Sequence, residues 1–101
     1  MQERQAPDPY FDPDNLRAMV RRWAIDCGRR VSETRKLRGY DRARLAALVG
    51  TGVPTIFRIE TGTLNPRDHM KLAIAAALVV EVEDLWPFPR RQTVFQEAGA
   101  A

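Results

Sequence analysis

The chain has 101 residues, of which 45% are hydrophobic and 29% charged, as expected for one globular domain with short tails. Its apolar runs are shorter than the roughly 18 residues of a membrane span, and its N-terminus lacks the apolar stretch of a signal peptide, so we expect a cytoplasmic protein without membrane contact. One cysteine, Cys27, and one histidine, His69, provide neither an intramolecular disulfide nor a zinc site, and we expect no metal and no cofactor.

The basic residues are unevenly distributed, although the net charge is only +3. A local excess of positive charge suits a polyanion such as a nucleic acid. A solvated helix face accounts for the same pattern, so the charge alone does not decide the function. Seven basic residues stand against two acidic residues (Glu33 and Asp41) in the stretch that contains Arg29, Arg30, Arg35, Lys36, Arg38, Arg42 and Arg44.

Residues 1–11 hold two prolines and show no periodicity, so they predict a flexible arm. Asp12 followed by Pro13 is typical of a helix start. From Leu16 to Leu37, apolar residues recur at spacings of three and four and predict one face of a helical region that ends near Gly39. Gly28 leaves open whether residues 13–38 form one helix or two.

Two short helices with a glycine-containing turn are predicted next, between Asp41 and Glu60. Asp41 is a good N-cap and Gly50 a good end for the first of them. Because Pro54 disfavours helical geometry at the residue before it, we expect the second to begin at Pro54 with Val53 as its cap. This arrangement is typical of a helix-turn-helix.

The rest of the chain predicts a loop over residues 61–66, an apolar helix opened by Asp68 and a short last helix over residues 81–86. Residues 88–101 are expected to form a C-terminal tail. We do not expect an enzyme, because the sequence shows no paired carboxylates, no nucleophile with a histidine base and no phosphate-binding glycine loop.

The segment from Arg30 to Trp86 resembles the Cro and lambda-repressor-like (XRE-type) helix-turn-helix family. This resemblance implies an all-α fold, a compact five-helix bundle over residues 30–87 with an extra N-terminal helical extension over residues 12–29. In the family the third helix enters the major groove, and dimers bind two half-sites. The resemblance rests on Arg35, Gly39, Leu45-Ala46, Gly50, Thr55-Ile56, Arg58-Ile59-Glu60, Gly62, Pro66, Leu78-Val79-Val80 and Leu85-Trp86.

The family resemblance also implies roles for single residues. Arg35 and Glu60 match a structural ion pair between the first helix and the recognition helix. Arg42 stands where the family contacts a DNA phosphate. Further candidates for phosphate contact are Thr51, Thr63, Asn65 and Arg67.

The bases would be read from the exposed face of the third helix, by Val53, Pro54, Thr55, Phe57 and Arg58. The family usually has polar residues where this chain has Gly52, Val53 and Pro54, which leaves apolar surface for thymine methyl groups. Arg58 either binds guanine O6 and N7 or meets a phosphate. Phe57 either packs at the edge of the core or touches bases or a partner.

We therefore expect a sequence-specific double-stranded DNA-binding regulator. The leading interpretation is a repressor of the phage Cro or immunity-repressor type, bound as a homodimer to a near-palindromic operator. The alternative is the antitoxin of a toxin–antitoxin pair, with the toxin as a further partner. Two dimer surfaces remain open: one with Leu85, Trp86 and Phe88, and one with Leu16, Met19, Val20 and Trp23.

Overall fold

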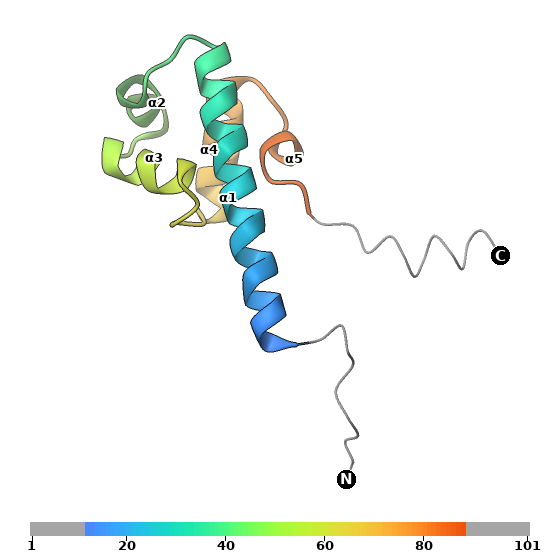
Figure 1. Cartoon of the computed structure of the whole chain (residues 1–101). Helices are drawn as coiled ribbons and strands as arrows, with labels where there is room; N and C mark the ends of the chain where they lie inside the picture. The colour runs from blue at the N-terminus through green and yellow to red at the C-terminus, as the bar shows by residue number, and fades with distance from the viewer. Residues whose placement is uncertain (1–11, 89–101) are drawn as a thin grey trace, which may run out of the picture.

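A computed structural model of the chain describes residues 12–88, which form five α-helices and no strand. The all-α fold predicted from the sequence is confirmed. The predicted arm, residues 1–11, and residues 89–101 of the predicted tail lie outside the described residues. The helices are α1 (Pro13–Leu37), α2 (Arg42–Val49), α3 (Val53–Glu60), α4 (Asp68–Leu78) and α5 (Val82–Leu85), and α2 to α5 gather beside α1 (Figure 1).

α1 is one continuous helix of 25 residues. It begins as predicted, because the Asp12 carboxylate accepts a hydrogen bond from the backbone N–H of Asp14 at 3.2 Å. Gly28 does not break it. A Cβ atom at Gly28 would lie 2.5 Å from the carbonyl oxygen of Glu60 and closer still to that of Ile59. The glycine thus weakens the helix locally but lets the end of α3 approach the backbone of α1.

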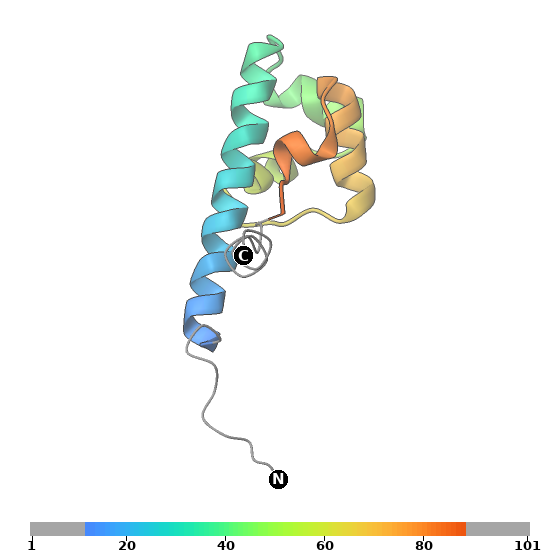
Figure 2. The same ribbon diagram turned by 90° about the vertical axis from the view of Figure 1, so that its right-hand side faces the viewer.

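The two halves of α1 have different surroundings. Figure 2 shows the other helices on one side of α1 and its first turns extending beyond them. Cys27 and Val31 are buried in the core, whereas Met19 and Val20 are 54% and 56% exposed. The predicted apolar face is therefore covered mainly in its middle part, around Cys27 and Val31. Leu37, at the end of that face, is also exposed.

The hydrophobic core lies where the five helices meet. Leu85 and Trp86, which we expected at a dimer surface, belong to this core and are only 1% and 4% exposed. The reason is that α5 is a single turn packed against α1 and α4, so its apolar side chains are covered within the protomer. The buried apolar residues are Cys27, Val31, Leu45, Ala46, Ile56, Ile59, Ile74, Ala75, Leu78, Leu85 and Trp86.

The start of α3 differs by one residue from the prediction. Gly52 is the N-cap, and α3 begins at Val53 with Pro54 in its first turn. Proline loses no hydrogen bond there, because the first N–H groups of a helix have no acceptor within the helix. The backbone N–H groups of Thr55 and Ile56 both donate to the carbonyl of Gly52, at 3.1 and 3.3 Å, and these bonds hold Val53 in the helix.

The end of α4 is stabilised by a side chain from α1. Val79, the residue after α4, has a left-handed backbone with φ +60°. Arg38 donates from Nε to the carbonyl of Leu78 at 2.6 Å and from Nη2 to that of Val79 at 3.3 Å. Arg38 therefore satisfies carbonyl groups that the helix leaves without a partner. None of the described helices combines the length and the apolar character that crossing a membrane requires.

Candidate nucleic-acid interface

α2 and α3 form the helix-turn-helix predicted between Asp41 and Glu60. The Asp41 carboxylate accepts a hydrogen bond from the backbone N–H of Arg44 at 2.8 Å and starts α2. Gly50, with φ +76°, ends it, and only Thr51 and Gly52 separate this residue from α3. In the view of Figure 1 the pair of helices lies to the left of α1, whereas α5 lies to its right. The outer surface of the pair is thus free of the rest of the bundle.

α3 has one buried face and one exposed face. Ile56, Ile59 and Glu60 face the core. Thr55 is half-buried between the two faces. The remaining predicted base readers are exposed: Val53, Pro54, Phe57 and Arg58. The structure therefore places these four side chains on the exposed face of α3.

The Glu60 carboxylate joins three helices. It accepts hydrogen bonds from Arg35 Nε at 2.6 Å and Arg35 Nη2 at 3.1 Å, and from Arg42 Nε at 2.9 Å. The side chains of Arg35 and Glu60 are only 6% and 2% exposed, and Arg35 also donates to the carbonyl of Tyr40. The hydrogen bond to Glu60 raises the pKa of Arg35 and keeps this buried guanidinium charged. The structure thus brings the expected ion pair together.

The Arg42 side chain has two partners within the protein, Glu60 and Phe57. Besides its bond to Glu60, its guanidinium carbon lies 5.1 Å from the centroid of the Phe57 ring, within the range of a cation–π interaction. Its side chain is 39% exposed. Sequence reasoning did not foresee this contact, because the two residues are 15 positions apart and meet only through the turn between α2 and α3.

Most arginines of the basic run contact other groups of the protein. Arg29 donates to Asp26 at 2.7 Å, Arg30 donates to the carbonyl of Asp84, and Arg38 closes the end of α4. Arg44 lies over the ring of Tyr40. These arginines therefore have partners within the protein, whereas their role toward a nucleic acid stays a prediction.

The loop after α3 is tied to α3 and to α1. The hydroxyl of Thr63 donates to the carbonyl of Arg58 at 3.2 Å, so it helps to end α3. A Cβ atom at Gly62, where φ is +81°, would lie 2.7 Å from the Cα of Ile25. Asn65 and Arg67 remain exposed, and Thr51 is half-buried.

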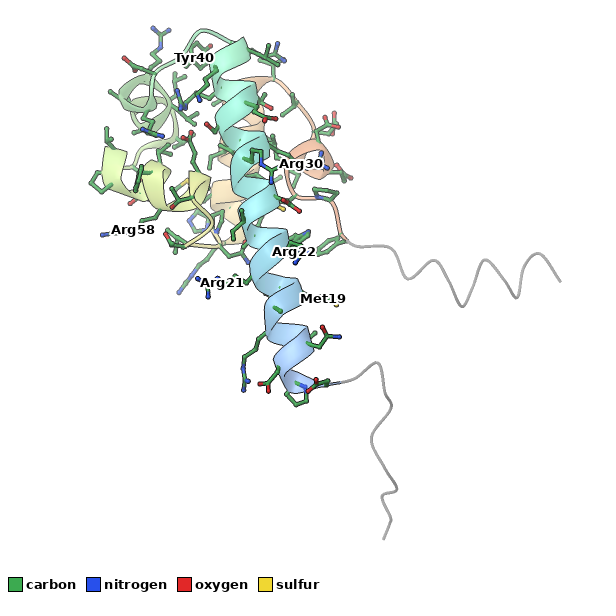
Figure 3. All side chains as sticks on the ribbon, viewed as in Figure 1. Met19, Arg21, Arg22, Arg30, Tyr40 and Arg58 are labelled. Carbon is green, nitrogen blue, oxygen red and sulfur yellow. The ribbon has the colours of Figure 1, made fainter. Side chains whose placement is uncertain are left out.

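One basic residue near this loop was not singled out from the sequence. Arg21 of α1 and Asn65 line the same shallow groove between α1 and the loop. Figure 3 shows the Arg21 and Arg58 side chains on the same side of the molecule, with Met19 on the other side. A helical pattern places Arg21 on α1 but carries no information about the loop that packs beside it.

The comparison with protein families now decides the assignment. A sequence profile described as helix-turn-helix matches residues 31–85, more than half of the chain. The chain belongs to the helix-turn-helix family. This helix-turn-helix protein is a DNA-binding transcriptional regulator, and the resemblance seen in the sequence is confirmed. The N-terminal half of α1 precedes the matched segment.

The fold is also similar to that of a solved regulator. The restriction-modification controller protein C.AhdI from Aeromonas hydrophila shares 28% sequence identity with this helix-turn-helix protein, with a TM-score of 0.60. The similarity covers 67% of this chain and 97% of the controller protein. No curated protein gave a significant match.

Proposed function

We propose that this helix-turn-helix protein places α3 in the major groove of a near-palindromic operator, binds there as a homodimer and represses transcription. The observation that carries the proposal is the exposed face of α3, held in place from behind. Gly28 lets α3 contact the backbone of α1, and the Glu60 carboxylate ties α3 to Arg35 and Arg42. A reading helix held in this way loses little freedom on binding.

Arg58 is the proposed hydrogen-bonding base reader. Its side chain is exposed and has no hydrogen bond or ion pair within residues 12–88. Arginine binds guanine through O6 and N7, and such a pair discriminates by about 1–3 kcal/mol against a wrong base. The proposed phosphate contacts lie around it, on α2 and in the adjoining loops: Arg42, Thr51, Thr63, Asn65 and Arg67.

The proposed dimer surface combines parts of the two surfaces left open by the sequence. Trp23 Nε1 donates to the carbonyl of Pro87 at 2.5 Å, and the Trp23 and Phe88 rings stack with centroids 6.3 Å apart. Met19 precedes Trp23 by one helical turn and is 54% exposed, while Phe88 is 81% exposed. We propose that a second copy covers these three residues in a two-fold dimer.

Selection of bound sequences from random DNA, followed by salt titration on the best site, tests the proposal. We expect a site with two-fold symmetry and an affinity that falls steeply with salt. Arg58→Ala should relax the preference at one or two positions in each half-site. Arg29→Ala, which removes an exposed arginine bonded to Asp26, is the matched control and should leave the preference unchanged. Absent or salt-insensitive DNA binding would contradict the proposal.

A second candidate function is favoured by the structural comparison. The similar protein is a restriction-modification controller, so we also consider control of genes for DNA cleavage and methylation. A reporter fused to the promoter that carries the selected site separates the two roles. Repression of that promoter supports the first proposal, and activation of neighbouring nuclease or methyltransferase genes supports the second. Co-purification with a small toxic protein would instead support the antitoxin alternative.

A further inference from the structure

We infer that Val53, Pro54 and Phe57 form an apolar reading surface for the C5-methyl group of a pyrimidine in the major groove, and that this surface accepts thymine and 5-methylcytosine alike. The inference rests on the proposed function and specifies what its recognition helix recognises.

The N-cap and the first two residues of α3 carry no hydrogen-bonding side chain. Gly52 has no side chain, and Val53 and Pro54 carry neither a donor nor an acceptor beyond the backbone. On the edges of the bases, the C5-methyl group of thymine is the apolar feature that the major groove presents. Contact with this methyl group is therefore the sequence-dependent interaction that these side chains are able to make.

The three residues lie together on the exposed face of α3. Val53 and Phe57 are four positions apart and Pro54 and Phe57 three, so they are neighbours on the helix surface. Val53 is 42% exposed and Phe57 49%. Both side chains thus retain surface that a methyl group would cover.

Phe57 is held in position before DNA arrives. The Arg42 guanidinium lies over its ring and is itself bonded to the buried Glu60 carboxylate. The ring is 49% exposed and lies outside the hydrophobic core, so it is available for the base contact that we propose. A restrained aromatic ring loses little side-chain entropy when it meets a base.

The chemistry of the target explains why two bases are equivalent. 5-Methylcytosine carries its methyl group on the same ring carbon as thymine. The two bases differ at position 4, where thymine presents an oxygen acceptor and cytosine an amino donor. An apolar surface forms a hydrogen bond with neither group, so it responds to the methyl group and not to the difference between the bases.

The test removes or adds single methyl groups in the selected operator. Replacing each thymine by deoxyuridine, one position at a time, should lower the affinity about fourfold at one or two positions in each half-site. At those positions, a C·G pair should be bound about fourfold more tightly when its cytosine is methylated at C5. The deoxyuridine experiment measures the response to the methyl group of thymine. The C5-methylation experiment measures the response to that of 5-methylcytosine.

Variants of the chain link the effect to this surface. In Phe57→Ala and in Val53→Ala, the ratio of the affinities with and without the methyl group should approach one. Arg29→Ala, which removes an exposed arginine on α1, should leave that ratio unchanged. Leu72→Ala, which shortens an exposed leucine on α4, is the matched apolar control and should also leave the ratio unchanged. Thermal melting shows whether each variant is folded, and two separate variants keep the test valid if one of them is not.

The outcomes distinguish this inference from the proposed function. Specific binding with no response to deoxyuridine at any position would overturn the inference and leave the proposed function intact. A response that persists in both Phe57→Ala and Val53→Ala would also overturn it, since the methyl group would then contact another part of the chain. The lack of any sequence-specific binding would overturn the proposed function as well.

Discussion

Gly28→Ala should destabilise the protein although it replaces a glycine inside a helix. In an exposed helix this change is worth about 1 kcal/mol of added stability. Here the new methyl group would lie 2.5 Å from the carbonyl oxygen of Glu60 and 2.8 Å from its carbonyl carbon, so α1 and α3 must separate. An ordinary contact of about 3.4 Å requires a shift of about 1 Å, and overpacking of this kind costs about 1–3 kcal/mol. We expect the cost of overpacking to exceed the gain in helix stability, so the free energy of unfolding should fall.

Thermal melting measures this effect directly. For a domain of this size, each kcal/mol of lost stability lowers Tm by about 4–8 °C. Asn15→Ala, on the exposed first turns of the same helix, is the control and should change the stability by less than about 0.5 kcal/mol. A Gly28→Ala protein that melts at or above the wild-type Tm would refute the reasoning about the close approach of α1 and α3.

Three further changes test other parts of the fold. Glu60→Gln leaves two arginines facing a neutral amide and should lower the free energy of unfolding, measured in urea, by about 3–5 kcal/mol. As the control, Asp26→Asn breaks only an exposed ion pair and should lower it by less than about 1 kcal/mol. Val79→Gly should raise Tm, because a β-branched residue at φ +60° is strained and the side chain is exposed. Burial raises the pKa of the Cys27 thiol, so the unfolded chain loses this proton at a lower pH than the folded protein and stability falls as the pH rises above the unfolded pKa. The urea midpoint of Cys27→Ala should therefore fall less between pH 7 and 9.5 than that of the wild type. Equal falls would contradict this.

The parts of the fold that depend on local chemistry were predictable from the sequence. Asp12 and Asp41 start helices and Gly50 ends one, because each of these residues acts on backbone groups within a few positions of itself. The start of α3 was misplaced by one residue, since the preference set by Pro54 is weaker than the two hydrogen bonds to the Gly52 carbonyl.

The parts that depend on distant contacts were not predictable. Gly28 is compatible with a break or with a continuous helix, and the sequence does not show that the end of α3, about 30 residues later, lies against it. The apolar character of Leu85 and Trp86 does not say whether the same chain or a second copy covers them. The bond between Arg42 and Glu60 likewise depends on how α2 and α3 meet. The roles of the base-reading residues stay predictions.

The unbroken course of α1 has a mechanical consequence. Residues 13–22 add about 15 Å of helix before Trp23, and the loop after α3 flanks the last of them at Arg21. At Gly28 and Gly62 the backbone of α1 meets α3 and the loop after it, without a layer of side chains that would absorb movement. At these two glycines, a shift of α1 would therefore press directly on α3 and on the loop that follows it.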